Sequence, residues 1–173
     1  MTQELIDLRN SILEGRYADA LELVDELEGM SKKATLRNIK SYLVRMVIHL
    51  IKNQVEQRLT NSWVASISDS ILQIQDLNLQ DNKTSHYVKP DEWEPMLVDA
   101  LAAAIRPASV EVLNGRVKPS QLSEMVNRTQ IILTSQQLLA LTYVYSASVL
   151  PDIIDEYLTQ LPGGEDWFED RRE

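Results

Sequence analysis

The chain has 173 residues, a net charge of −9 and a 44% share of hydrophobic residues, which fits one domain with a buried core. It contains no cysteine, which excludes a disulfide scaffold, a thiolate metal site and a cysteine nucleophile. Frequent Leu, Ile, Val and Ala beside a single Phe favour helices over strands, so we predict an all-α fold.

The first 30 residues are acidic and the next 30 are basic. Residues 1–30 hold eight acidic and two basic residues, whereas residues 31–60 hold seven basic residues and one acidic residue. Apolar spacing predicts helices at residues 4–14, 16–28 and 31–58, and Gly29 is expected to end the second. Because the connection is short, we expect the second and third helices to form an antiparallel hairpin whose opposite charges face each other.

Proline or a capping residue marks the start of most later helices. These helices are predicted at residues 62–76, 90–106, 119–128, 135–148 and 151–160, with a polar loop at 78–89. Pro107 should kink or end the helix that precedes it. We therefore expect a single all-α domain at residues 1–160, a compact bundle of six or seven helices around the central hairpin. Residues 161–173 are acidic without periodicity, which predicts a loosely ordered tail.

The sequence carries no recognisable membrane or export signal. Its most apolar run, residues 42–51, is interrupted by Arg45 and His49 and is much shorter than the roughly 20 residues of a membrane span. The first residues lack the basic and apolar regions of a secretory signal. We therefore expect a cytoplasmic location and no membrane partner.

A row of polar residues on the third predicted helix is the candidate functional face. Arg45, His49, Lys52 and Glu56 are spaced so that all four share one side of the helix. Such a row fits anion binding or proton transfer by His49, but it also fits a polar flank beside the core in which Lys52 and Glu56 pair locally. Both interpretations stay open.

Trp63, near the start of the next helix, extends this candidate face. A tryptophan there serves either as a core anchor or as a stacking surface for a ligand. No metal site is predicted, because the chain has two histidines and tight sites need three or four converging ligands. No cofactor is predicted either, since the sequence holds no glycine-rich phosphate loop or nucleophile elbow.

Three short segments together resemble a known family. They are Val24-Asp25-Glu26-Leu27-Glu28, His49-Leu50-Ile51-Lys52 and Ser62-Trp63. Over about residues 16–80 they are similar to the bacterial family called domain of unknown function 29, which is abundant in cyanobacteria. The chain departs from that family's pattern at Asn53, where an aromatic residue is common. The resemblance implies an all-α bacterial protein, brings no reaction with it, and marks His49, Lys52 and Trp63 for testing.

Three classes of function are compatible with these features. We predict a small protein-interaction or adaptor protein that binds a protein partner or self-associates as a homodimer, because apolar helix faces are plentiful and no catalytic constellation is present. The alternative is a small-ligand-binding protein or enzyme that uses Arg45, His49 and Lys52. The third is a nucleic-acid binder through residues 32–58, which the overall negative charge disfavours.

Overall fold

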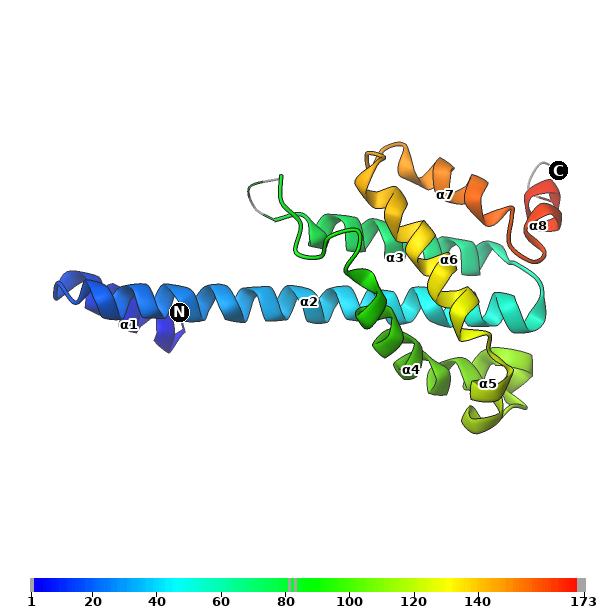
Figure 1. Ribbon diagram of the computed structural model, residues 1–173, viewed down its shortest axis with the longest axis horizontal. Coiled ribbons are helices and arrows are strands. Elements are labelled where there is room, and N and C mark those ends of the chain that lie inside the picture. The colour runs from blue at the N-terminus through cyan, green and yellow to red at the C-terminus, as the bar shows by residue number, and fades with distance from the viewer. Residues whose placement is uncertain (1, 81, 83, 171–173) are drawn as a thin grey trace. The chain divides into compact units, whose positions relative to one another are not determined.

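The computed structural model describes residues 2–80, 82 and 84–170, and most of these residues are helical (Figure 1). In chain order the helices are α1 (Gln3–Leu13), α2 (Tyr17–Glu56), α3 (Asn61–Asn78), α4 (Trp93–Glu111), α5 (Pro119–Met125), α6 (Arg128–Ala140), α7 (Leu150–Leu158) and α8 (Gly164–Asp170), with the 3₁₀ turns η1 (Val112–Gly115) and η2 (Leu141–Tyr143). Leu79 and His86 form an isolated antiparallel bridge. The prediction of an all-α fold is confirmed.

The chain divides into two compact units, Met1–Asn38 and Ile39–Glu173. The first unit holds α1 and the beginning of α2, and the second holds the rest of α2 and every later helix. Each unit is described below by itself.

The predicted hairpin at Gly29 is wrong, because α2 continues without a break through this residue. Gly29 adopts a helical backbone, whereas Gly15, Gly115 and Gly163 have the positive φ angles that end helices. A glycine inside a helix costs only about 1 kcal/mol relative to alanine, and no proline follows it within α2. The acidic and basic segments are therefore successive parts of one helix and do not face each other across a turn.

A hairpin does form one step earlier in the chain, between α1 and α2. Gly15, at φ +76°, makes the turn, and the amide of Arg16 donates to the carbonyl of Ser11 at 2.8 Å. The Arg16 guanidinium lies 2.9 Å from Glu14 and 3.1 Å from Asp19, which ties the turn to the first turn of α2. Of residues 2–38, only Ser11 and Ala20 are fully buried. This two-helix unit therefore lacks a core of its own.

The second unit has a continuous apolar core. The C-terminal part of α2 contributes a broad buried stripe, and among the later helices α3 packs against α7 and α4 packs against α5 and α6. Figure 1 shows these helices beside this part of α2. The largest fully buried side chains are Ile39, Leu43, Met46, Ile51, Ile67, Ile71, Ile74, Trp93, Leu97, Leu101, Leu122 and Leu138. The apolar spacing that predicted a helix at residues 31–58 thus faces this core from Ile39 to Ile51.

Helix α4 runs past Pro107, where the sequence predicted a kink or an end, and stops four residues later at Glu111. Ala104 and Ala108 are fully buried on either side of Pro107. Packing of this face compensates for the backbone hydrogen bond that the proline removes. The predicted polar loop at 78–89 lies between α3 and α4, and buried Asn78 holds it by accepting from the Val88 amide at 2.7 Å and donating to its carbonyl at 2.9 Å.

Residues 164–170 form α8, in the segment where we expected a loosely ordered tail. Trp167 is 5% exposed, and its indole N–H donates to Asn61 Oδ1 at 2.9 Å. The chain turns at Gly163, with φ +72°, just before α8, and a Cβ atom at Gly164 would clash with the carbonyl oxygens of Leu158 and Thr159. One buried indole is enough to anchor a short segment whose acidic residues show no helical period. Residues 171–173 lie outside the described part of the chain.

Candidate functional site

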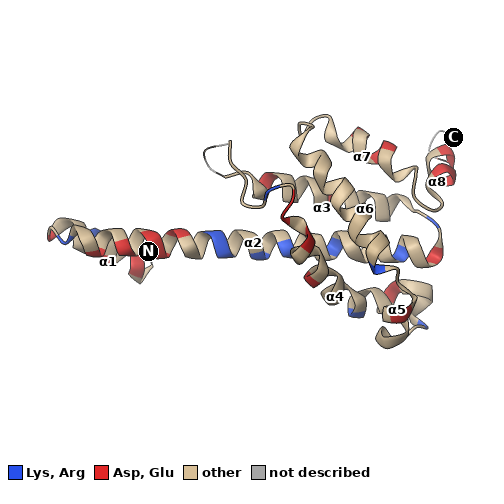
Figure 2. Cartoon of the chain, in the orientation of Figure 1, with Lys and Arg blue, Asp and Glu red and all other residues tan. Residues whose placement is uncertain are grey.

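The predicted row Arg45, His49, Lys52 and Glu56 lies on the part of α2 that belongs to the second unit, along which Lys and Arg residues recur (Figure 2). Its first member, Arg45, pairs with Asp69 of α3 at 2.5 Å. Both side chains are close to half exposed, so this ion pair contributes about 0–1 kcal/mol to stability and chiefly orients the two helices.

Lys52 is the most buried charged member of the row, with a side chain that is 10% exposed. Its Nζ atom lies 3.2 Å from Glu111 Oε2 on α4 and 4.8 Å from the ring centroid of Trp63 on α3. The aliphatic part of Lys52 is thus inside the unit while its charge is matched by a carboxylate and an aromatic face. Lys52 therefore joins α2, α3 and α4.

Arg58 is a second cation against the ring of Trp63, and it also pairs with Glu56. The Arg58 Cζ atom lies 4.6 Å from the Trp63 ring centroid, and its guanidinium donates to Glu56 at 3.1 and 3.2 Å. Glu56 therefore pairs with Arg58 and Lys52 with Glu111, and the local Lys52–Glu56 pair considered in the sequence is not what forms. Trp63 itself is 6% exposed, which is a core position with two cations against its ring.

His49 lies between these ion pairs and is partly buried. Its Nδ1 atom is buried without a hydrogen-bond partner in the described structure. Burial, aided by the positive charge of Lys52 and more weakly of Arg45 and opposed by Glu111, lowers the pKa of His49 to about 4. The imidazole is therefore neutral near pH 7, which leaves it without the charge that anion binding by this residue would use.

The structure thus links Lys52, Glu56 and Trp63 through shared contacts, places His49 beside them and pairs Arg45 separately with Asp69. Sequence reasoning missed the partners Asp69, Arg58 and Glu111 and the buried Asn53. Glu111 is 59 positions from Lys52, and no local pattern links the two. Asn53 is buried and donates to the carbonyls of Arg58 at 3.1 Å and Pro162 at 2.7 Å, which closes the end of α2. Its signal was present as a departure from the family pattern. That this face has a function stays a prediction.

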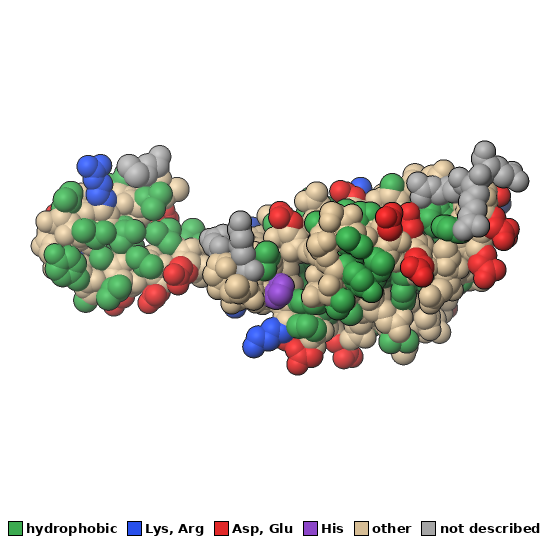
Figure 3. Space-filling view, turned by 90° about the horizontal axis from the view of Figure 1, so that it is seen from above, with side chains coloured by type: hydrophobic (Ala, Val, Ile, Leu, Met, Phe, Trp, Pro, Cys, Tyr) green, Lys and Arg blue, Asp and Glu red, His purple; other side chains and the backbone are tan. Residues whose placement is uncertain are grey.

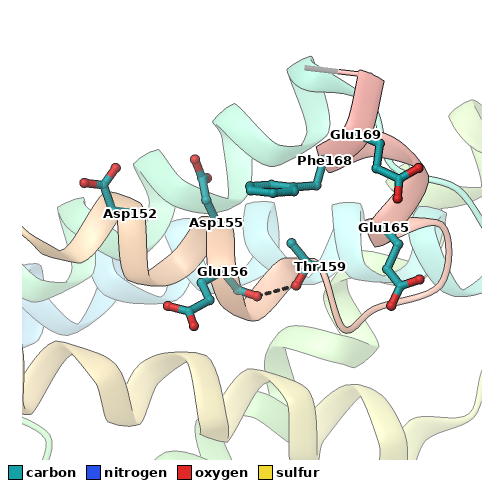
Figure 4. Close-up of a pocket in the computed structure, with 7 residues that line it drawn as sticks. All are labelled: Asp152, Asp155, Glu156, Thr159, Glu165, Phe168 and Glu169. Atoms are coloured by element: carbon teal, nitrogen blue, oxygen red, sulfur yellow. Dashed lines mark hydrogen bonds between the residues drawn. The ribbon is translucent and has the colours of Figure 1, made fainter. Parts of the chain in front are cut away.

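A second feature is an open pocket of about 570 Å³ between α7 and α8 (Figure 4). Carboxylates from both helices surround it, and the ring of Phe168 extends from α8 toward α7. The lining residues are Asp152, Asp155, Glu156, Thr159, Glu165, Phe168 and Glu169. Within the described residues, no group of three or more histidines and carboxylates is placed to hold a metal ion.

The third feature is the surface of the α1–α2 hairpin, which has two unlike faces. One face is an acidic groove lined mainly by polar and charged side chains, including Asp7, Glu14, Asp19, Glu22 and Glu26. On the other, large apolar side chains are exposed and gather together in the space-filling view (Figure 3). We call this second surface the apolar face of the hairpin. It consists of Leu5, Ile6, Ile12, Leu13, Tyr17, Leu21 and Val24.

Comparison with family models decides the identity of the chain. The model of the family described as domain of unknown function DUF29 matches residues 3–143, which is most of the chain. The protein belongs to the DUF29 family. The match covers both the α1–α2 hairpin and the helices that carry the polar row, so it is wider than the resemblance at residues 16–80.

The other comparisons bring no further relative: no curated protein and no solved structure matches the chain. The DUF29 family has no stated activity, and the function of this protein is unknown. None of the described helices combines the length and the hydropathy that a membrane-spanning segment requires.

Proposed function

We propose that this DUF29 protein works in the cytoplasm as a protein-interaction module, with the apolar face of the α1–α2 hairpin as its contact surface. One observation carries the proposal. Seven large apolar side chains are exposed within the first 24 residues, while only Ser11 and Ala20 of residues 2–38 are fully buried. Contiguous exposed apolar surface of this kind typically marks a protein contact.

Folding of the hairpin alone does not account for this surface. Two helices joined by a tight turn bury little area, and most helical stability in proteins comes from packing an apolar face against other elements. Tyr17 and Leu21, exposed at 66% and 67%, lie on the same side of α2 at a spacing of four residues. A protein partner on this side would supply the burial that the hairpin lacks.

The second unit offers a matched control. Val110 on α4 and Val144 after η2 are exposed at 71% and 73%, so they equal Tyr17 and Leu21 in exposure but belong to another surface. The Tyr17→Ser/Leu21→Ser and Val110→Ser/Val144→Ser variants therefore each lose two exposed apolar side chains, and neither change opens the core.

The test is affinity capture from a lysate of the host organism, with mass spectrometry of the recovered proteins. We expect the wild-type protein and the Val110→Ser/Val144→Ser control to recover the same proteins. The Tyr17→Ser/Leu21→Ser variant should lose most of them, including the host's own copies of this chain. Far-UV circular dichroism must show equal helix content in all three. Recovery of the same proteins by the hairpin variant would refute the proposed contact surface.

A further inference from the structure

The two faces of the α1–α2 hairpin are chemically segregated, and this segregation bears on what covers the apolar one. At about 100° per residue, Glu22 and Glu26 lie on the side of α2 roughly opposite to Tyr17, Leu21 and Val24. The two glutamates line the acidic groove together with Asp7 and Glu14 of the α1 side. The five carboxylates of the groove are thus kept off the apolar face, and the charges that the helical spacing places beside that face are Arg9 on α1 and Asp25 and Glu28 on α2.

This segregation permits close approach of two identical, negatively charged hairpins. Residues 1–30 hold eight acidic and two basic residues, so two copies repel each other at long range. If the apolar faces meet, the acidic grooves point away from each other and no carboxylate of the groove is buried. A partner recognised through its positive charge would instead need the acidic groove, which is on the other side.

The size of the apolar face also fits a second copy. Its seven side chains are between 36% and 73% exposed. With about 150–200 Å² for a large side chain, they present on the order of 600 Å² per copy. A standard interface buries about 800 Å² per partner, of which rather more than half is apolar. The face therefore supplies the apolar part of a complete two-fold interface.

We propose that two copies of this chain associate through the apolar faces of their α1–α2 hairpins, forming a four-helix arrangement from two hairpins. The inference rests on the proposed function, because it names the partner of the same surface. A two-fold contact is self-complementary, so one apolar face per copy satisfies both partners and leaves no exposed second site. The core that each hairpin lacks is then built between the copies.

Salt separates this arrangement from binding of a basic partner. Repulsion between two acidic hairpins is screened by salt, whereas the apolar contact is not weakened by it. Self-association of the wild-type chain should therefore stay constant or tighten as salt is raised. A contact formed by opposite charges would weaken under the same change.

The experiment is sedimentation equilibrium of the full-length chain, purified without other proteins, at low and high salt. We expect a dimer that is retained at high salt and in the Val110→Ser/Val144→Ser control. The dissociation constant of the Tyr17→Ser/Leu21→Ser variant should rise about 100-fold or more, because four apolar side chains leave the interface. A dimer unchanged in this variant, or one that dissociates as salt is raised, would overturn the proposal.

Cysteine cross-linking gives an independent readout, because the chain contains no cysteine of its own. A short bis-maleimide should link two copies of a Leu21→Cys variant and should not link copies of an Asn10→Cys variant, whose residue lines the acidic groove. Equal cross-linking of both variants contradicts the proposed face. If the wild-type chain is a monomer and its capture of host proteins still depends on Tyr17 and Leu21, self-association alone is rejected. If the Tyr17→Ser/Leu21→Ser variant keeps both the dimer and the captured host proteins, the proposed function is rejected as well.

Discussion

Lys52 lies against Trp63 with its ammonium nitrogen 4.8 Å from the ring centroid, and the same nitrogen is 3.2 Å from the carboxylate of Glu111. The Lys52 side chain is 10% exposed, while that of Glu111 is 53% exposed. The cost of leaving one charge without its partner therefore differs between Lys52 and Glu111. Without Glu111 a buried charge loses its carboxylate, whereas without Lys52 the glutamate is still hydrated.

Replacement of Glu111 should consequently cost more than replacement of its partner. We expect Glu111→Gln to lower the free energy of unfolding by about 1–2 kcal/mol, a value reduced because half of the pair is in water. Lys52→Met keeps the aliphatic stem in the core and should cost less than about 1 kcal/mol. Urea unfolding followed by circular dichroism measures both, with Asp99→Asn on exposed α4 surface as the control. A larger loss for Lys52→Met than for Glu111→Gln would contradict this account.

The depressed pKa of His49 predicts a pH dependence of stability. The pKa of His49 is about 4 in the folded protein and about 6.5 in the unfolded chain, so folding favours the neutral ring. Between these values the unfolded state binds more protons, so stability contributed by His49 is complete above about pH 6.5 and is lost as the pH falls toward 4. With allowance for partial exposure the loss is on the order of 2 kcal/mol.

The measurement is urea unfolding across this pH range for the wild-type chain, a His49→Gln variant and a His86→Gln control. His49→Gln should flatten the decline in stability between about pH 6.5 and 4, and the control should not. NMR titration of the His49 ring gives the folded pKa directly. A ring that titrates near its ordinary value would show that burial does not act on His49 as described.

The long periodic stretch of α2 that faces the core was placed correctly from the sequence, whereas the helix predicted at residues 135–148 was not, since α6 ends at Ala140 and a 3₁₀ turn follows. The stripe through Leu43, Met46 and Leu50 predicted its helix, because helical spacing is a local property. Gly29 misled the prediction, since a glycine near a change of charge reads as a helix end when no tertiary information is present. The candidate row was found by spacing alone, but the partners that define its chemistry, Asp69 and Glu111, come from other helices.

Two glycines that look alike in sequence should respond in opposite ways to alanine. A Cβ atom at Gly164 would lie 2.2 Å from the carbonyl oxygen of Leu158, so the backbone must shift. A Cβ atom at Gly29 meets nothing within 4 Å, and the helical backbone there suits alanine. We expect Gly164→Ala to lower the unfolding free energy by about 2–4 kcal/mol. Gly29→Ala should leave it unchanged or raise it by up to about 1 kcal/mol.

Thermal unfolding of the two variants under one set of conditions tests this contrast. The midpoint of Gly164→Ala should fall clearly below that of the wild type, and that of Gly29→Ala should not. A destabilised Gly29→Ala variant would show that this stretch of α2 departs from a regular helix or that another chain packs closely on Gly29.

The C-terminal segment provides a last test, because sequence and structure give it different roles. The sequence predicted that the folded domain stops at residue 160, whereas Trp167 of α8 is buried and donates to Asn61 at the start of α3. Trp167→Ala should therefore cost about 3–4 kcal/mol, as expected for loss of a buried indole together with its hydrogen bond. Phe168→Ala, at a more exposed neighbouring position, should cost clearly less.

Removal of residues 161–173 should cost at least as much as Trp167→Ala, since it also deletes the Pro162 carbonyl to which buried Asn53 donates at 2.7 Å. Asn53 would then lose a buried hydrogen bond at the end of α2, which adds about 1–3 kcal/mol. Chemical unfolding of the truncated chain measures the sum. A truncated protein as stable as the wild type would restore the boundary at residue 160 and make α8 an appendage, whereas a large loss makes it part of the core that closes α2 and α3.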